Sequence, residues 1–335
     1  MPIRRCCLAL CLGVAAVLLA NSAARAEVKE VNLSRQFAVS FLPLMVMEKQ
    51  VLIESQAAKL GISDLKATWT QMSGPSVMVD ALLAGSIHYS AQGPPSVGLL
   101  WDRTKGQIKG VSAIANYPLT LMTRNKDAKS VKDFTEKDKI ALTSVKVSMQ
   151  AIMLQMLAEK EFGPGQQFKL DPMTVGLANP DGMAAILSPV SEITAHFTTS
   201  PFTEIELKAG LKPLITSYDI LGGKATALVL VTADKFRDQN PTVHRAVLAA
   251  LDESIAWINA DKKRAAALYL EMTRDKKSTV EETLAGISAP GFEFTRTPHK
   301  VFKMIEFMHH IGSVKTKPAS WKDLFFPEAH ALDGD

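Results

Sequence analysis

Small polar residues stand between a short apolar strand and a long apolar helix in the stretch 140–163. The stretch reads IALTSVKVSMQAIMLQMLAEKEFG, with Ser144, Val145 and Lys146 before or in the opening of the predicted helix. The first turn of a helix has unpaired N–H groups and a partial positive charge, so it can hold an oxyanion without a metal. Ser144 can cap the helix or donate its hydroxyl. The junction predicts a site for a small anion, and an ordinary capped helix is the alternative.

A second polar group follows the first predicted strand. Arg35, Gln36, Phe37 and Ser40 could bring a charge, an amide, an aromatic wall and a hydroxyl to the same site. The planar guanidinium of Arg35 fits a carboxylate or a sulfonate, although it could equally be a surface arginine.

Further candidates lie in turns and at the ends of strands. Gln92 and Gly93 stand in a turn where backbone amides could approach a ligand closely, and a structural Gly-Pro-Pro turn is the alternative. Thr198 and Thr199 end a later strand and could donate hydrogen bonds. The remaining candidates are Ser73, in the loop after the second strand, and Asn116 and Tyr117, which could close a cleft or only stabilise a hinge.

The sequence carries no pattern for catalysis or metal binding. Its 7 histidines are scattered, and the adjacent His309 and His310 are not an i, i+4 chelating pair. It contains neither a G-x-S-x-G elbow nor a Walker A sequence. We therefore expect no metal, no cofactor and no enzymatic activity.

Residues 1–26 have the pattern of a secretory signal peptide. Arg4 and Arg5 precede an apolar run, and Ala24-Arg25-Ala26 forms a cleavage site before Glu27. A membrane anchor is the alternative, but about 15 apolar residues are fewer than the ~20 that span a bilayer. All 3 cysteines lie in this segment, so we expect a mature chain without disulfides or thiol chemistry.

The charge balance bears on the partners of the mature chain. Removing three arginines from 38 basic residues leaves 35 against 34 acidic residues, a formal charge of +1. This balance gives no reason to expect nucleic acid or a strongly charged membrane surface as a partner. With 47% hydrophobic residues in 335, the chain can form one large or two medium domains. We expect a soluble, exported monomer.

Predicted strands and helices alternate along the chain, which favours largely parallel sheets with helices on both faces. Ligands of such folds often bind at the carboxyl ends of the strands. Strands are expected at 28–33, 65–71, 87–91, 108–115, 119–124, 139–142, 173–176, 193–197 and 225–232. Helices are expected at 43–60, 76–83 after a turn at 73–75, 96–103, 149–160, 180–187, 240–259, 262–272 and 300–310.

Five segments together carry a family resemblance. In chain order they read RQFAVSFLPL, LLAGSIHYSAQGPPS, FTEKDKIALTSVKVSMQAIMLQMLAEKEFG, MAAILSPVSEITAHFTTSPF and YDILGG. Their order and spacing resemble the periplasmic substrate-binding proteins of ABC importers of the nitrate, sulfonate and taurine class, over most of residues 27–275. The thiamine-pyrimidine-precursor binding proteins are related to this class. Ile87-His88-Tyr89 stands where members often have an acidic residue, which leaves the specificity open.

The resemblance implies an α/β fold of the type II periplasmic binding proteins, with two lobes, each with a mainly parallel sheet flanked by helices. Two hinge crossovers, near 115–119 and 218–225, would join them. The expected division is a signal peptide at 1–26, a first lobe at 27–115 and 223–335, and a second lobe at 116–222.

The resemblance also implies a function. A small ligand, such as a sulfonate, nitrate or carboxylate, would be captured between the lobes in the periplasm and delivered to an ABC permease of the inner membrane. A periplasmic ligand sensor is one alternative, and an enzyme related to thiamine-pyrimidine synthesis is another.

Overall fold

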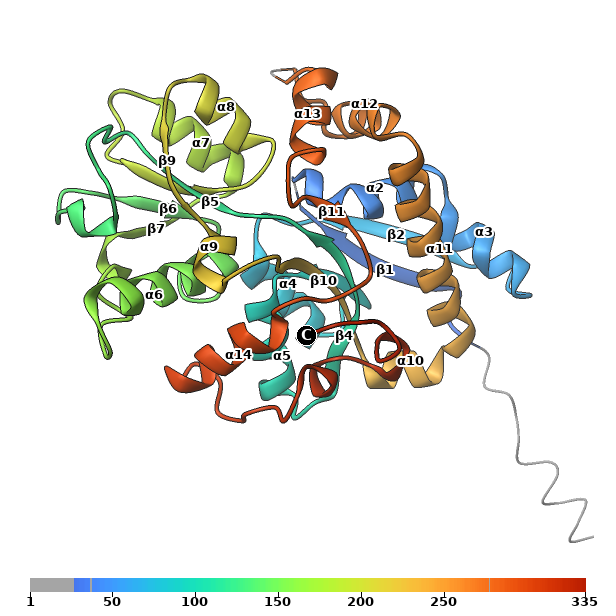
Figure 1. Ribbon diagram of the computed structural model, residues 1–335. Helices are drawn as coiled ribbons and strands as arrows, with labels where there is room; N and C mark the ends of the chain where they lie inside the picture. Colours follow the sequence, from blue (N-terminus) through green and yellow to red (C-terminus); the bar gives the residue numbers. More distant parts are fainter. Residues whose placement is uncertain (1–26, 37, 277) are drawn as a thin grey trace, which may run out of the picture.

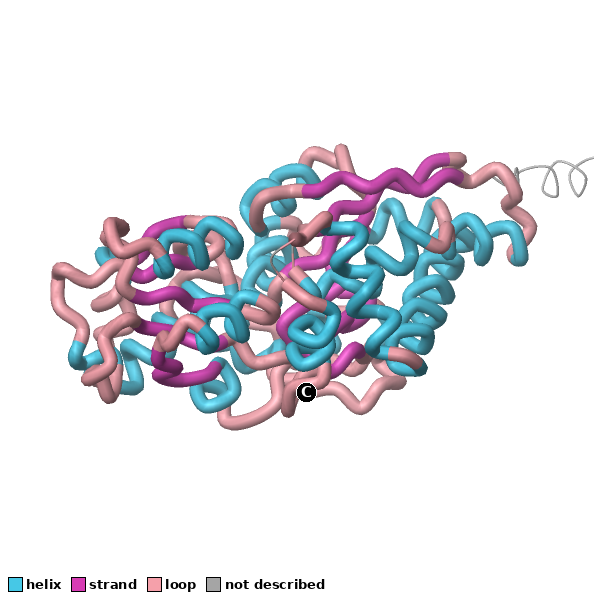
Figure 2. The backbone as a smooth tube through the Cα atoms, turned by 90° about the horizontal axis from the view of Figure 1, so that it is seen from above, coloured by secondary structure: helices cyan, strands magenta, loops and turns pink. Residues whose placement is uncertain are grey.

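The computed structural model describes residues 27–36, 38–276 and 278–335. In these ranges the strands form two sheets, each flanked by helices, and we name the two parts the first and second lobes (Figure 1). Seen from above, the two groups of strands lie apart, with helices around each (Figure 2). This arrangement confirms the predicted α/β fold class.

The six-stranded sheet of the first lobe has the order β11-β4-β10-β3-β1-β2. β1 is parallel to both β2 and β3, whereas β10 is antiparallel to β3 and to β4, so β4 runs in the direction of β3. Four of its strands therefore run in one direction, whereas β10, inserted between β3 and β4, and the edge strand β11 run in the reverse direction. The bounds are β1 (Glu30–Arg35), β2 (Lys66–Gln71), β3 (Tyr89–Gln92), β4 (Ile108–Asn116), β10 (Thr226–Ala233) and β11 (Glu293–Phe294).

The five-stranded sheet of the second lobe has the order β7-β6-β8-β5-β9. β6 is parallel to β7 and β8, and β5 is the reversed strand between β8 and β9. The bounds are β5 (Thr120–Thr123), β6 (Ile140–Leu142), β7 (Thr174–Gly176), β8 (Ala195–Thr198) and β9 (Lys212–Thr216). The exact domain boundaries expected from the sequence, after residues 115 and 222, remain a prediction.

In the described part of the chain, two connections join the lobes. Residues 117–119 link β4 to β5, and α9 (Ser217–Leu221) with residues 222–225 links β9 to β10. The connections are hydrogen-bonded to each other: the Leu119 N–H donates to Ser217 Oγ at 3.0 Å, and the Ser217 N–H donates to the Leu119 carbonyl at 2.8 Å. These are the two crossovers expected from the sequence.

Helices of the second lobe are α6 (Met149–Phe162), α7 (Asn179–Leu187) and α8 (Phe202–Lys208). The helix predicted at 43–60 is interrupted, because Val51 adopts a left-handed conformation with φ of 53°. First-lobe helices are α2 (Leu42–Lys49), α3 (Leu52–Lys59), α4 (Pro75–Leu83), α5 (Pro94–Arg103), α10 (Asp234–Gln239), α11 (Pro241–Ala260), α12 (Lys262–Thr273), α13 (Val280–Ile287) and α14 (Val301–His310). The short elements α8, α9, α10, α13, β9 and β11 were not predicted. None of the helices in the described ranges is long and apolar enough to cross a bilayer.

The C-terminal segment completes the core of the first lobe. The ring of Phe325 lies on Gly110 of β4, where a Cβ atom would stand only 2.6 Å from the ring. The Phe326 N–H donates to the Gly110 carbonyl at 2.8 Å. α14 packs against α5, with Ile305 directly on Gly98. A glycine at 98 and at 110 therefore lets these elements approach closely.

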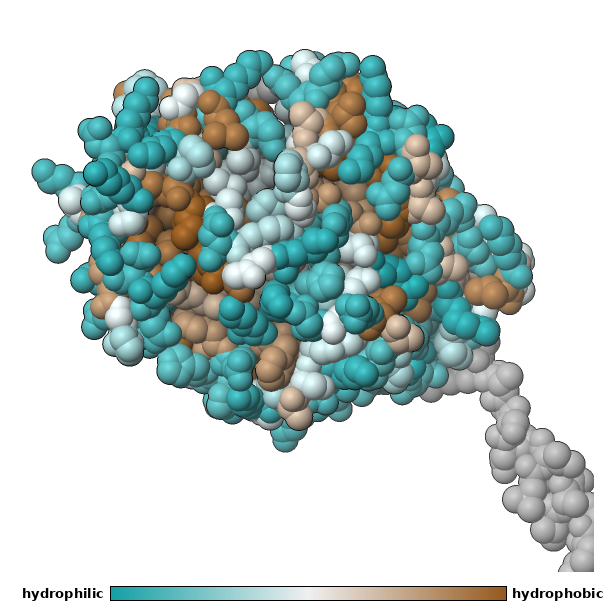
Figure 3. Space-filling view, viewed as in Figure 1, coloured by the Kyte–Doolittle hydropathy of each residue, from teal (hydrophilic) through white to brown (hydrophobic). Residues whose placement is uncertain are grey.

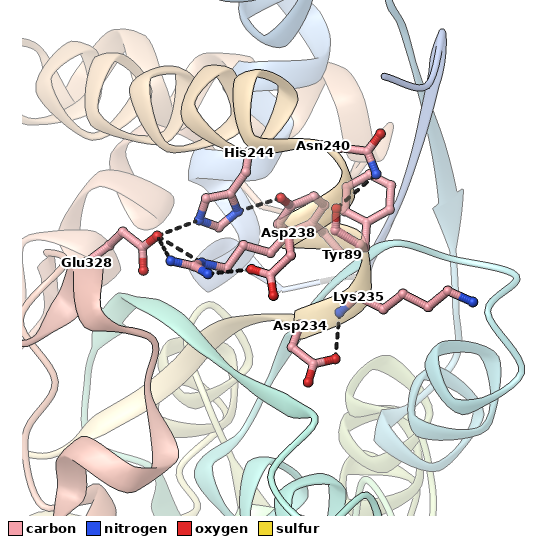
Figure 4. Close-up of polar contacts among 9 residues, drawn as sticks. Tyr89, Asp234, Lys235, Asp238, Asn240, His244 and Glu328 are labelled. Atoms are coloured by element: carbon pink, nitrogen blue, oxygen red, sulfur yellow. Dashed lines mark hydrogen bonds and ion pairs between the residues drawn. The ribbon is translucent and has the colours of Figure 1, made fainter. Parts of the chain in front are cut away.

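A partly buried polar cluster ties α11 and β3 to the C-terminal segment (Figure 4). The Tyr89 hydroxyl is 2.8 Å from His244 Nδ1, and His244 Nε2 lies 3.6 Å from Glu328 Oε1. Arg237 donates to the same Glu328 oxygen from Nε at 2.8 Å and from Nη2 at 2.6 Å. Burial lowers the pKa of His244 to about 4, so the imidazole is neutral at pH 7.

Candidate functional site

A cavity of about 60 Å³ lies between the two lobes. The first lobe contributes residues from the loop after β1, from the starts of α4 and α5 and from β10; the second contributes the starts of α6 and α7 and the end of β8. The lining consists of Gln36, Ala38, Ser40, Phe41, Pro75, Gly93, Ser96, Tyr117, Leu119, Thr143, Ser148, Met149, Gln150, Asn179, Thr199, Ala227 and Leu228.

Within the described ranges, four helices begin at this cavity, two from each lobe. Pro75 and Asn179 are the first residues of α4 and α7, Gly93 precedes α5, and Met149 begins α6. Ser148 caps α6, its Oγ accepting from the Ala151 N–H at 3.2 Å. The N–H groups of the first turn have no acceptor inside the helix, and the helix dipole is positive at this end. The four N-termini thus favour negative charge in the cavity.

The described lining contains unpaired buried polar atoms. Ser40 Oγ, Thr199 Oγ1 and Asn179 Oδ1 form no hydrogen bond of regular geometry, although the two hydroxyls lie near the Tyr117 phenol. These residues are 0%, 3% and 8% exposed. Buried polar groups in native proteins nearly always have a partner, from the protein, from water or from a ligand. Three such atoms around one cavity indicate a place that a polar solute completes.

The described lining is also uncharged, since none of its residues is Lys, Arg, His, Asp or Glu. Tyr117 is its one titratable side chain, and its ring stacks on Phe292 with centroids 5.1 Å apart. Burial raises the pKa of the Tyr117 phenol, and the nearby hydroxyls of Ser40 and Thr199 partly offset this effect. The phenol is therefore neutral at pH 7 and can donate a hydrogen bond to a solute.

A wider chamber of about 440 Å³ shares Thr143 with the cavity. Its wall consists mainly of small residues from the start of α4, the loop after β6 and the end of β7. The lining comprises Ser73, Gly74, Ser76, Val77, Thr143, Ser144, Val145, Gly176, Leu177, Ala178 and Asp181. Ser76 Oγ donates to Ser144 Oγ at 3.3 Å, which joins the two lobes beside the cavity. We call this space the outer chamber.

Other contacts between the lobes enclose the site. Ser96 Oγ donates to the Val147 carbonyl at 3.5 Å, and Lys208 Nζ lies 2.7 Å from Glu282 Oε1. At another position His310 Nε2 lies 3.2 Å from Glu159 Oε1. Ser200 of the second lobe fills the space beside Gly286 of α13. The lobes therefore stand in a closed arrangement.

The structure brings together many of the candidate residues. The cavity is lined by Gln36, Ser40, Gly93, Tyr117 and Thr199, and the outer chamber by Ser73, Ser144 and Val145. Phe37 lies outside the described residues. Arg35, Gln92, Asn116, Lys146 and Thr198 line neither space.

Arg35 has local partners in place of a ligand. Its Nε donates to Glu48 Oε2 at 2.7 Å and its Nη1 to Gln71 Oε1 at 3.1 Å. The side chain is only 11% exposed. Because Arg35 has these partners and lines neither space, we leave it out of the proposed site.

The other four candidates also lie outside the two linings, and three of them form hydrogen bonds with neighbouring residues. Asn116 Oδ1 accepts from Thr226 Oγ1 at 2.8 Å, which holds β4 to β10 at the hinge. Gln92 Nε2 donates to Ser90 Oγ at 2.8 Å, and Thr198 Oγ1 donates to the Thr199 carbonyl at 3.4 Å. Lys146 is in a turn with φ of 68°. The cap of α6 is Ser148 and not Ser144, because the turn over residues 145–147 delays the helix to Met149.

The main omission from the sequence prediction is the start of α7. Asn179 lines the cavity, as do Thr143 and Gln150, whose side chains are joined by a hydrogen bond of 3.0 Å. The strand at 173–176 and the following helix were both predicted. Because carboxyl ends of parallel strands meet at one edge of a sheet, residues just after β7 should have been placed beside those after β6.

The described residues include no group of three or more His, Cys, Asp or Glu placed to hold a metal ion. No curated protein matches the sequence. Solved structures do resemble it at low identity.

The nitrate-binding protein NrtA of Synechocystis PCC 6803 has 16% identity and a TM-score of 0.70, over 92% of this chain and 90% of its own. The alkanesulfonate-binding protein SsuA of Xanthomonas axonopodis pv. citri, solved with MOPS bound, has 16% identity and a TM-score of 0.68, over 90% and 99%. The aliphatic sulphonate-binding SsuA of Escherichia coli has 15% identity and a TM-score of 0.67, over 90% and 92%.

These structures confirm the fold of the periplasmic binding proteins and the resemblance expected from the sequence. The model of the NMT1-like family matches residues 24–271, well over half of the sequence. The chain is therefore a member of the NMT1-like family.

Proposed function

We propose that the protein is the periplasmic solute-binding component of an ABC import system. It would hold a small anion between its lobes and deliver it to a permease of the inner membrane. The main support for this proposal is the cavity between the lobes, which is lined by four helix N-termini and by three buried polar atoms without a regular hydrogen bond. The structural neighbours NrtA and SsuA, which are named for nitrate and sulfonate binding, support the same assignment.

The cavity limits the chemistry of the ligand. A buried water needs roughly 10–15 Å³ of such space, so about 60 Å³ accepts a group of about four to six heavy atoms. Uncharged donors and helix dipoles suit one negative charge better than two, because no side-chain cation is there to neutralise the second. We therefore propose nitrate, a small carboxylate or the head group of a sulfonate, with the outer chamber available to a larger body.

Capture rather than catalysis is supported by the lining. Among its described residues only Tyr117 could exchange a proton, and its raised pKa makes it a poor base at pH 7. We further propose export through the signal peptide at 1–26 and action as a monomer. A ligand sensor would use the same cavity.

A thermal-shift screen of the mature protein with nitrate, small sulfonates, carboxylates and pyrimidines tests the proposal. A ligand that binds only the folded state raises the melting temperature with concentration. The expected result is at least one anion that does so, with domain closure visible by small-angle scattering. No shift with any of these solutes, and no co-purified molecule in native mass spectrometry, would contradict it.

An uptake assay distinguishes a role in import from a role in sensing. A cell that lacks the partner permease should lose uptake of the ligand if the protein serves import. Unchanged uptake in that cell would favour the sensor.

A further inference from the structure

A second, larger cavity lies in the second lobe, away from the interface between the lobes. It measures about 680 Å³ and is formed between residues 132–139 and residues 162–173. Lys139, which lines it, comes just before β6, whereas Thr143 of the binding cavity comes just after β6. The two cavities therefore lie at opposite ends of one strand. We call this second space the lysine pocket.

The lysine pocket has an apolar floor. Phe134 and Leu170 are almost fully buried, at 8% and 2% exposure, and Phe162, Pro172 and Met173 complete the surface. Figure 3 shows hydrophobic surface where Figure 1 places β6, β7 and α6. A ligand pocket is usually a concave, mainly apolar surface of about 300–1,000 Å³ with a few polar groups. The volume and the floor both match this description.

The polar groups of the pocket are mostly cationic. Three lysines line it, Lys132, Lys139 and Lys169, against one acidic residue, Glu136, which gives a formal charge of 3 − 1 = +2. Lys132 is paired with Glu161 at 3.2 Å. Lys169 Nζ stands 4.3 Å from the centroid of the Phe162 ring, an attraction that holds the ammonium at the edge of the floor.

Lys139 is the group without a counterion. Its side chain is half-buried, and in the described part of the protein its ammonium has neither an ion-pair nor a hydrogen-bond partner. The nearest carboxylate in sequence, that of Asp138, already accepts from Thr194 Oγ1 at 2.8 Å and from the Thr135 N–H at 2.7 Å. A half-buried ammonium in a pocket that aromatic rings also line is suited to an anionic group carried on an apolar body.

We propose that the lysine pocket binds an amphipathic organic anion, a carboxylate or sulfonate with an aromatic or aliphatic body. The body lies against Phe134 and Phe162, and the acid group is held by Lys139 and Lys169. This site is independent of the proposed function, because it shares no residue with the cavity between the lobes.

Fluorescence titration with 8-anilinonaphthalene-1-sulfonate, an aromatic sulfonate whose emission rises in apolar surroundings, tests the proposal. The double variant Lys139→Gln and Lys169→Gln should bind this probe about tenfold more weakly than the unmodified protein, a loss of about 1.4 kcal/mol. Lys137→Gln is the matched control, because Lys137 is an exposed lysine of the same loop that does not line the pocket. It should retain the affinity within about twofold.

A further variant, Asn179→Ala, alters the cavity between the lobes and should leave binding of the probe unchanged. Equal affinity of the double variant and the unmodified protein would overturn the proposal. Loss of binding in Asn179→Ala would also overturn it, because the probe would then occupy the other cavity. Failure of the anion screen described above leaves this test unaffected.

Discussion

Thr199 and Asn179 bring oxygen atoms to the cavity that the described part of the protein leaves unpaired. They come from different elements of the second lobe, and Ser40 faces them from the first. Because an anion can accept from the hydroxyls of Thr199 and Ser40, it joins the lobes through hydrogen bonds that neither lobe can form alone. The amide oxygen of Asn179 instead requires a donor, such as a water molecule beside the anion. The affinity of the site should therefore depend on these side chains and not on Arg35.

Replacing Thr199 by Val removes one hydroxyl and keeps the shape of the side chain. We expect binding of the anion found in the screen to weaken roughly three- to tenfold, the usual effect of one lost hydrogen bond. Isothermal titration calorimetry measures the change. Arg35→Ala should retain the affinity of the unmodified protein, and a large loss in that variant with Thr199→Val unchanged would restore Arg35 to the site.

The buried side chain of His196 leaves no space for a side chain at Gly182 of α7. A Cβ atom at 182 would lie 2.6 Å from His196 Nε2, and the imidazole cannot move because its Nδ1 is 2.6 Å from Glu206 Oε1. We expect Gly182→Ala to destabilise the fold by about 1–3 kcal/mol through overpacking. Urea unfolding measures this.

The control for Gly182→Ala is Gly176→Ala, since a Cβ at 176 meets nothing within 4 Å. Similar unfolding midpoints for the two variants would refute the role assigned to His196.

At the scale of elements, α13 of the first lobe and α8 of the second meet at the edge of the cleft. Gly286 leaves space that Ser200 and Glu204 occupy from the other lobe. The exposed pair Lys208 and Glu282 lies next to this contact. The steric fit at Gly286 should matter more for closure than the ion pair, because exposed ion pairs contribute little to stability.

Gly286→Val places a branched side chain at this contact, away from the cavity lining. We expect it to hold the lobes apart, so the radius of gyration with saturating anion should stay near the value without anion. The affinity should fall as well. Lys208→Gln, which removes the ion pair and leaves the capping of α13 by Glu282 in place, should close like the unmodified protein in small-angle scattering. Normal closure of Gly286→Val would show that α13 does not limit the motion.

Elements that bury a long apolar face were predictable, and those fixed by tertiary contacts were not. β4, β10 and α11 have continuous or periodic apolar residues and fall within one or two residues of the prediction. The break at Val51 requires a left-handed conformation that a β-branched residue disfavours, so local preference argued against it. The two-residue β11 exists only through its pairing with β4. The same holds for the site: turn residues such as Gly93 were predictable, but the partner of Arg35 depended on how α2 lies against β1.

At the scale of the whole molecule, the cluster of Figure 4 makes stability depend on pH. The pKa of His244 in the folded protein is about 4, below its ordinary value of 6.5. Between pH 4 and pH 6.5 the imidazole is therefore protonated in the unfolded chain but neutral in the folded protein. The neutral imidazole of His244 contributes at most about 3 kcal/mol to the free energy of unfolding. This contribution is complete above about pH 6.5 and is lost as the pH falls to about 4. The pKa of Glu328 is also lowered: burial, the largest single effect, raises it, but the hydrogen bonds and the charge of Arg237, together with a backbone hydrogen bond, outweigh burial. The contribution of Glu328 to stability is likewise lost as the pH falls.

We expect His244→Gln to flatten the decline of unfolding free energy between pH 6.5 and pH 4. Urea unfolding at a series of pH values, compared with the unmodified protein, measures the difference. His310→Gln is the control, since His310 is exposed at the surface. Parallel curves for the unmodified protein and His244→Gln would exclude the cluster as the source of the acid sensitivity.

The reversed strand β10 lies between β3 and β4, although more than 100 residues separate it from either in the chain. All strands of the second lobe, in contrast, come from one continuous stretch, 120–216. A ribosome or a translocation channel releases the polypeptide from its N-terminus. The second lobe can therefore assemble while the sheet of the first lobe still lacks β10. Because the second crossover follows residue 216, the hinge can be completed only after this late segment has emerged and joined the sheet that the first residues begin.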